Sequence, residues 1–379
     1  EDIDRILDAF ESAQLPVIMM GRVGCDPTEW GNRIALVEAL DALAITSLHK
    51  RSAFPTTHAN HKLPISPERP GEAHTDLMAK TDVILDLDWL DLAGYLRLST
   101  GDSQSQKPTS ATVIKVSMDS TIAGGWSADY QALQAADINV LARPDTVVKQ
   151  LLKRIQERKS STVRPAISAL PHWTRSVTPP AASPAGEPMS LLELAWTVNE
   201  FCEGPRNVTL TRLPLGYPGG FCRFEHPLAY LGKDAGGAVG TGPGHAVGAA
   251  LALKDSGRLP VAVMGDGDFL MGMNAFWTAS HMDLPLMVVV ANNRSYFNDE
   301  AHQERVAVMR DRPPQNKWVG QRLDQPLIDI IALAVAQGFE GNEPITDADQ
   351  LLTEMERGEK VVKAGGRYII DARRTGYEG

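Results

Sequence analysis

The sequence predicts an α/β protein with two parallel-sheet domains. Three features support this fold class: short runs of apolar, β-branched residues recur along the chain, segments with helical spacing separate them, and one stretch rich in proline and serine interrupts the series. Strands that alternate with helices form parallel sheets, because each parallel pair requires a crossover connection. We therefore expect a first domain over residues 1–158, a linker over 159–188 and a second domain over 189–379.

Composition limits the classes of function. The chain has 379 residues, of which 43% are hydrophobic, and this is enough for more than one core. A net charge of −10 and the lack of a basic run argue against nucleic acid and anionic membranes as partners. No apolar run has the length of a membrane span, no signal peptide is visible, and the three cysteines form no paired motif. We expect a cytoplasmic protein and, because the chain begins with Glu1, a piece of something longer.

In the first domain, a buried strand over residues 15–20 runs into the turn Gly21-Arg22-Val23-Gly24. Such a turn can approach a nucleotide phosphate, but a plain tight turn between a strand and a helix has the same sequence. His58 and His61 are interpreted as loop residues, because nearby prolines oppose the helix that would join them at a metal. The other expected elements are strands over 43–48, 81–87 and 112–116 and helices over 4–13, 28–43 and 145–158.

The second domain is expected to begin with a helix, since Ser190 and Glu193 form a capping-box pattern before an apolar stripe. The glycine-rich run 232–253 then leads into a helix that starts near Pro243. A helix N-terminus of this kind offers amides to a diphosphate, and a glycine-loosened linker is the alternative. The closing elements are a polar segment over 294–318, interpreted as a lid, a helix that starts at Pro326 with a buried stripe from Leu327 to Val335, and a strand over 367–372.

The most informative stretch runs from Val261 to Tyr296. A buried strand stops at Gly265-Asp266-Gly267, a helix is expected over 269–282, and a second buried strand stops at Asn292-Asn293. Parallel strands joined by a crossover helix place their C-terminal ends side by side, so Asp266 and Asn293 can lie close together. One carboxylate and one amide oxygen suit Mg²⁺, which also takes phosphate oxygens.

At these residues the sequence resembles the acetolactate synthase and 2-oxoacid decarboxylase superfamily, whose thiamin diphosphate motif is GDG followed by NN at this spacing. The flanking residues DFLM, FWTA and LP extend the match. The first domain is similar to the superfamily's middle domain at PVIMMGRVG, KRSAFPTTH, TDVILDLD and VIKVSMD. The alternative is an ordinary βαβ unit with a glycine-rich turn. The resemblance implies a Rossmann-like middle domain followed by a thiamin diphosphate-binding domain.

The resemblance also implies a set of site residues. The implied Mg²⁺ ligands are the side chains of Asp266 and Asn293 and the main-chain carbonyl of Ser295. The implied cofactor contacts are Gly265, Gly267 and Asp268 at the diphosphate, and Gly237 and Val239 at the aminopyrimidine, with Val239 also below the two rings. Tyr296, Phe297 and His302 follow the metal residues and are candidates for substrate contacts, although His302 is equally consistent with a solvated histidine.

Further expectations concern a nucleotide cofactor and a partner chain. In some relatives the middle domain holds FAD, in others an ADP moiety, and here the glycine and arginine usual in flavin-holding members are missing after VILDLDWLD. The glutamate that activates the cofactor in the superfamily lies in a pyrimidine-binding domain, which this sequence lacks. We therefore expect a separate chain with that domain, in a dimer or tetramer of such units.

The resulting hypothesis is a subunit or fragment of an acetolactate synthase-like enzyme that uses thiamin diphosphate and Mg²⁺. It would act as a lyase or transferase on the C–C bond next to a carbonyl in a 2-oxo acid, a 2-hydroxyacyl compound or a 1,2-dione. The alternatives are a flavin-assisted enzyme of the pyruvate oxidase type and a non-catalytic subunit that holds the cofactor or regulates a partner.

Overall fold

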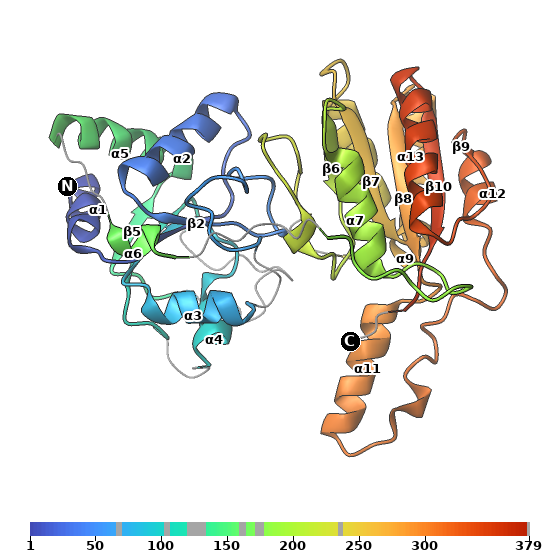
Figure 1. Ribbon diagram of the computed structural model, residues 1–379, viewed down its shortest axis with the longest axis horizontal. Coiled ribbons are helices and arrows are strands. Elements are labelled where there is room, and N and C mark those ends of the chain that lie inside the picture. Colours follow the sequence, from blue (N-terminus) through green and yellow to red (C-terminus); the bar gives the residue numbers. More distant parts are fainter. Residues whose placement is uncertain are drawn as a thin grey trace. The chain divides into compact units, whose positions relative to one another are not determined.

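The computed structural model describes residues 1–65, 70–101, 107–119, 134–158, 164–170, 178–233 and 238–376 (Figure 1). The chain forms two compact units. Unit 1 comprises Glu1–Arg175 and Cys222–Gly237, and unit 2 comprises Ser176–Phe221 and Ala238–Gly379. Each unit contains one five-stranded sheet in which every strand pairing is parallel. The predicted α/β fold class with two parallel sheets is therefore confirmed.

The sheet of unit 1 has the strand order β2-β1-β3-β4-β5. Its strands are β1 (Pro16–Met20), β2 (Leu43–Ile45), β3 (Val83–Leu87), β4 (Thr112–Ser117) and β5 (Ile138–Leu141). Its helices are α1 (Asp2–Ser12), α2 (Pro27–Ala39), α3 (Glu72–Lys80), α4 (Leu92–Thr100), α5 (Pro144–Arg158) and α6 (Pro165–Ser168). The first four strands were predicted from the sequence, whereas α3, α4, β5 and the four-residue α6, which lies in the expected linker, were not.

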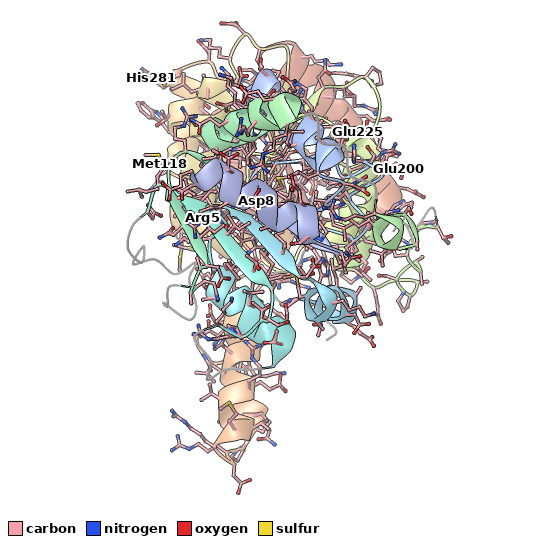
Figure 2. The ribbon with its side chains drawn as sticks, turned by 90° about the vertical axis from the view of Figure 1, so that its left-hand side faces the viewer. Arg5, Asp8, Met118, Glu200, Glu225 and His281 are labelled. Atoms are coloured by element: carbon pink, nitrogen blue, oxygen red, sulfur yellow. The ribbon has the colours of Figure 1, made fainter. Side chains whose placement is uncertain are left out.

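Unit 1 has a core on each face of its sheet. Ile18 and Met20 of β1 pack into the cluster that includes α1, α2 and α5, whereas Val17 and Met19 pack into the cluster with α3 and α4. Because successive side chains of a strand point to opposite faces, a strand covered on both sides reads as a continuous apolar run. Figure 2 looks onto the α1 side of this unit, with Arg5 and Asp8 on the exposed surface of that helix.

The sheet of unit 2 has the strand order β6-β7-β8-β10-β9. Its strands are β6 (Val208–Arg212), β7 (Leu259–Gly265), β8 (Leu286–Asn292), β9 (Glu340–Gly341) and β10 (Arg367–Arg373). Its α-helices are α7 (Leu191–Cys202), α8 (Gly242–Ala252), α9 (Asp266–Gly272), α10 (Ala275–His281), α11 (Phe297–Met309), α12 (Ile330–Val335) and α13 (Ala348–Lys363). Two short 3₁₀ turns, η1 (Gly219–Phe221) and η2 (Pro314–Asn316), complete the unit.

Several local expectations for unit 2 are confirmed and others are wrong. The capping box at the start of α7 is present, with the Ser190 hydroxyl accepting from the Glu193 amide and the Glu193 carboxylate accepting from the Ser190 amide. The single helix expected over 269–282 is two helices, α9 and α10, and α9 begins inside the GDG motif. The polar segment after β8 contains α11, which projects beyond the rest of the unit in both views (Figures 1 and 2).

The last short helix also begins later than its sequence predicts. It starts at Ile330, because Asp329 caps it by accepting from the amide of Ala332. Leu327 therefore lies before the helix and is 63% exposed, and Val335 at its end is 49% exposed. Only part of the expected buried stripe reaches the core.

Residues 222–233, which follow β6 in the sequence and contain no strand, pack within unit 1. The Tyr230 carbonyl accepts from the Ser52 amide at 2.8 Å, and the Tyr230 hydroxyl donates to the Leu48 carbonyl at 2.9 Å. The rings of Phe224 and Tyr230 stack with centroids 5.4 Å apart. Residues 222–233 are therefore held by the first unit immediately before the chain returns to the second.

Candidate cofactor site

The candidate site lies at the carboxyl edge of the unit 2 sheet, where β7 and β8 end side by side. Gly265, the last residue of β7, is paired with Ala291 of β8. The next residue after β7 is Asp266, which begins α9 and is 3% exposed. The first residue after β8 is Asn293. The parallel register therefore brings the two predicted side chains to the same level of the sheet, as the sequence predicts.

The oxygens of these two side chains converge on one backbone amide. The Ser295 N–H donates to Asp266 Oδ2 at 3.1 Å and to Asn293 Oδ1 at 3.2 Å. A carboxylate oxygen and an amide oxygen thus point to a common position beside the buried residue Ser295. This donor set fits Mg²⁺, which binds through one or two carboxylates together with neutral oxygens. Within the described ranges no group of three or more His, Cys, Asp or Glu is arranged to hold a metal ion.

Burial raises the pKa of Asp266 from 3.8 to about 6, while backbone amides and Arg374 act in the opposite direction. Desolvation disfavours an isolated carboxylate, and a cation placed beside it would favour the ionised form. Asp266 therefore has the electrostatic character of a carboxylate that lacks a positive partner close enough to offset its burial.

The ring of Tyr296 lies against Gly267 of the GDG motif. A Cβ atom added to Gly267 would lie 2.2 Å from Cε1 of the Tyr296 ring, so no larger residue fits there without moving the ring. The Tyr296 amide donates to the Gln321 carbonyl at 2.9 Å, and this bond fixes the backbone next to the ring. Burial, and secondarily the Asp266 carboxylate, raise the pKa of the Tyr296 hydroxyl.

Comparison with known proteins identifies this part of the chain. Residues 217–372 match the family model of the thiamine pyrophosphate enzyme C-terminal TPP binding domain. The chain is a relative of the thiamin diphosphate-dependent enzymes. The matched range contains the strand ends, Asp266 and Asn293, so the resemblance seen in the sequence is confirmed for the domain that carries the candidate site.

Two curated proteins extend the comparison beyond that domain. The chain is 24% identical over 394 residues to the acetolactate synthase isozyme 3 large subunit of Escherichia coli, covering 99% of the chain and 62% of that protein. It is 24% identical over 332 residues to sulfoacetaldehyde acetyltransferase of Alcaligenes xylosoxydans, covering 78% of the chain and 52% of that protein. The chain thus spans 62% of the length of the first relative and 52% of the length of the second.

Solved structures show the same fold at low identity. The thiamine diphosphate-dependent 4-hydroxybenzoylformate decarboxylase of Rhodococcus jostii matches with a TM-score of 0.71 and 21% identity, covering 100% of this chain and 64% of that one. The benzoylformate decarboxylase of Polynucleobacter necessarius matches with a TM-score of 0.74 and 18% identity, covering 99% and 64%. The fold is therefore that of thiamin diphosphate-dependent enzymes.

The side chain of Asp268, a residue predicted to contact the diphosphate, points to the loop before α8. Its Oδ1 accepts from the amides of Gly240 at 2.7 Å and Gly242 at 3.0 Å, and its Oδ2 pairs with Arg212 at 3.1 Å. The first amide of α8 is therefore occupied by a carboxylate. The N-terminus of the helix near Pro243, where the sequence predicts a contact to a diphosphate, thus has one of its amides bonded to a protein carboxylate.

The other predicted residues are placed as follows. Val239 lies in the turn before α8 and is 41% exposed, whereas Gly237 lies outside the described residues. His302 lies on the exposed surface of α11, where its Nδ1 is 2.9 Å from a guanidinium nitrogen of Arg305.

Two residues beside Ser295 were not predicted. Ser295 Oγ donates to Glu300 of α11, and Arg322 pairs with the same carboxylate oxygen of Glu300 at 2.9 Å. Glu300 is 1% exposed, and its Oε2 has no hydrogen-bond partner among the residues that the structure describes. Sequence analysis missed this group because Glu300 and Arg322 belong to no motif, and only the return of the chain after α11 brings them together.

The first strand-to-helix turn of unit 1 does not fit a nucleotide phosphate. The amides of Gly21, Arg22 and Val23 donate to backbone carbonyls, and the Gly24 amide donates to Asp145 Oδ2 at 2.7 Å. No amide from Gly21 to Gly24 remains to bind a phosphate. The geometry thus gives no support for FAD or ADP at this position.

Within the described part of the chain, no helix is both long and apolar enough to cross a membrane.

Proposed function

We propose that the chain is a subunit or fragment of a thiamin diphosphate- and Mg²⁺-dependent enzyme that makes or breaks C–C bonds next to a carbonyl. The observation that carries the proposal is the convergence of the Asp266 carboxylate and the Asn293 amide oxygen on one position at the carboxyl edge of the sheet. That position lies in the range that matches a thiamine pyrophosphate-binding domain. The substrate class is a 2-oxo acid, a 2-hydroxyacyl compound or a 1,2-dione, in keeping with the names of the relatives.

In this proposal the metal is bound by Asp266 Oδ, Asn293 Oδ1 and the main-chain carbonyl of Ser295. Oxygens of the cofactor diphosphate and a water would complete the set of ligands, because Mg²⁺ sites usually combine few protein ligands with phosphate oxygens and water. The amides of Gly267 and Asp268, in the first turn of α9, would be offered to the diphosphate. When bound, thiamin diphosphate supplies the electron sink for the C–C chemistry, and the protein supplies binding, orientation and electrostatics.

Tyr296 has two roles in this account. Its ring lies against Gly267 and shields one side of the metal position from water, which strengthens electrostatic interactions there. Its hydroxyl stays protonated at neutral pH, because burial raises its pKa above an already high value. Tyr296 is therefore suited to donate a hydrogen bond to a substrate carbonyl.

The glutamate that activates the cofactor is proposed to come from a separate pyrimidine-binding chain. In the superfamily that the sequence resembles, the cofactor lies between domains of different subunits, so such a division is compatible with the chemistry. The expected consequence is that the 379-residue chain with cofactor and Mg²⁺ has nearly no turnover. Rapid turnover by the verified single chain would refute this part of the proposal without affecting cofactor binding.

The experiment for the central proposal is calorimetric titration of the chain with thiamin diphosphate, with Mg²⁺ and with EDTA. We expect binding that requires Mg²⁺ and that Asp266→Ala reduces by about 100-fold or more, because an ionic metal ligand and its hydrogen bonds are lost. The matched control is Asp349→Ala, which removes an exposed carboxylate from the first turn of α13. Equal affinities of wild type and Asp266→Ala would overturn the metal assignment.

A further inference from the structure

We infer that Asp268 and Arg212 are a positioning pair that fixes the turn over residues 238–242 on α9 and thereby sets the position of Val239. The inference rests on the proposed function, because Val239 is the residue proposed to lie below the cofactor rings. The side chains of the pair contact each other and the turn. Their role is therefore to hold the backbone that presents a contact to the cofactor.

The first argument is the hydrogen bonding of the Asp268 carboxylate. Oδ1 accepts two backbone amides, from Gly240 and Gly242, and Oδ2 lies 3.3 Å from Nε and 3.1 Å from a terminal nitrogen of Arg212. The side chains of Asp268 and Arg212 are only 10% and 6% exposed. Ionised hydrogen-bond partners at low exposure bind more strongly than neutral ones, so this carboxylate holds the turn firmly.

The second argument is the origin of the groups that the carboxylate joins. Arg212 is the last residue of β6, and Asp268 lies in the first turn of α9 directly after β7. The Gly240 amide belongs to the turn before α8, and the Gly242 amide is the first of α8. β6 and β7 are neighbours in the sheet. The pair thus connects the edge of the sheet with the start of α8 and the turn before it.

The turn also packs closely against α9. A Cβ atom added to Gly240 would lie 2.8 Å from Met271 Cβ, and one added to Gly272 would lie 2.2 Å from the Gly240 carbonyl oxygen. A Cβ atom added to Gly242 would lie 2.3 Å from Asp268 Oδ2. The turn therefore has little room to shift on α9, and a change at Asp268 is transmitted to Gly240, which directly follows Val239, and to Gly242.

These contacts assign the diphosphate and the rings of the cofactor to different segments of the chain. The Asp268 carboxylate already occupies the start of α8, so the diphosphate is left to the Asp266–Asp268 turn, and the 238–242 turn serves the rings. Loss of the Asp268 carboxylate should weaken the contribution of the rings to the binding affinity and leave the contribution of the diphosphate unchanged. A general loss of structure would weaken both.

The test compares two probes, thiamin diphosphate and inorganic pyrophosphate, each titrated with Mg²⁺ into the 379-residue chain. For Asp268→Asn, which keeps the shape and backbone but removes the charge, we expect about tenfold or more weaker binding of thiamin diphosphate and a change of less than about twofold for pyrophosphate. Arg212→Gln should give the same selective loss. The matched control is Asp347→Asn, since Asp347 caps α13 by accepting from the Gln350 amide.

A second measurement needs no ligand. Amide hydrogen exchange of residues 238–242 should be slow in the wild type and at least about tenfold faster in both variants. Asp268→Asn replaces the ionised acceptor of the Gly240 and Gly242 amides with a neutral one, and Arg212→Gln removes the guanidinium that holds that acceptor in place. Unchanged exchange, unchanged affinity for thiamin diphosphate, or equal losses for both probes would each overturn the inference. A wild type that binds neither probe would instead refute the proposed function, while the exchange result would still decide whether the pair holds the turn.

Discussion

Asp86 offers a quantitative test of the packing of unit 1. This residue of β3 is fully buried, and burial raises its pKa from 3.8 to about 7, with a smaller contribution from the charge of Asp88. Its Oδ1 accepts from the Trp89 amide at 2.5 Å, and its Oδ2 has no partner among the described residues. Asp86→Asn keeps an acceptor for Trp89 and removes the charge, so it isolates the electrostatic cost of the buried carboxylate.

The sign follows from proton linkage. The folded pKa lies above the unfolded value, so the folded state binds more protons between pH 4 and pH 7, and stability falls as pH rises through this window. At about 1.36 kcal/mol per pH unit, the full change from 3.8 to about 7 corresponds to about 4 kcal/mol. About 2 to 3 kcal/mol of this change in the free energy of unfolding falls between pH 5 and pH 8.

The assay is urea unfolding at pH 5 and pH 8 for the wild type, for Asp86→Asn and for the control Asp76→Asn, an exposed residue of α3. Other titrating groups contribute equally to all three proteins, so the comparison isolates Asp86. Between pH 5 and pH 8 we expect the wild type to lose about 2 to 3 kcal/mol more of its free energy of unfolding than Asp86→Asn loses. Parallel pH profiles for Asp86→Asn and wild type would refute the reasoning.

Three further predictions concern the site and the nucleotide question. Gly267→Ala should displace the Tyr296 ring and weaken Mg²⁺-dependent thiamin diphosphate binding by about tenfold or more in calorimetry, while Gly244→Ala, whose added Cβ meets no atom within 4 Å, should bind as wild type. Glu300→Gln weakens the support of Ser295 and should reduce Mg²⁺ affinity in the presence of cofactor by about tenfold, and full affinity would contradict that role. Equilibrium dialysis with ADP and with FAD should show no saturable binding, because the first strand-to-helix turn of unit 1 already donates its amides to protein acceptors; a saturable, yellow complex would favour the flavin-assisted alternative.

The sequence predicts that Asp266 and Asn293 lie close together, because this geometry follows from topology. Two buried strands in a right-handed crossover must end at the same edge, so the residues after them, Asp266 and Asn293, meet without any knowledge of side-chain packing. The same reasoning locates the first four strands of unit 1, whose continuous apolar runs are typical of strands covered on both faces.

The remaining features depend on tertiary contacts that no local pattern contains. Asp268 was predicted from its backbone position, but the direction of its side chain is set by Arg212, which lies far away in the sequence. α3 and α4 are short and only moderately apolar, so helical periodicity gives a weak signal for them. The Glu300 group exists only because the chain returns after α11 to place Arg322 beside it.

The most direct test of the central claim is a crystal structure of the chain grown with thiamin diphosphate and Mn²⁺, with the ion located by its anomalous scattering. The account predicts one ion bound by Asp266 Oδ, Asn293 Oδ1 and the Ser295 carbonyl oxygen, with two diphosphate oxygens and a water completing the octahedron. An ion at other residues, or a diphosphate bound at the start of α8 in place of the Asp268 carboxylate, would contradict it.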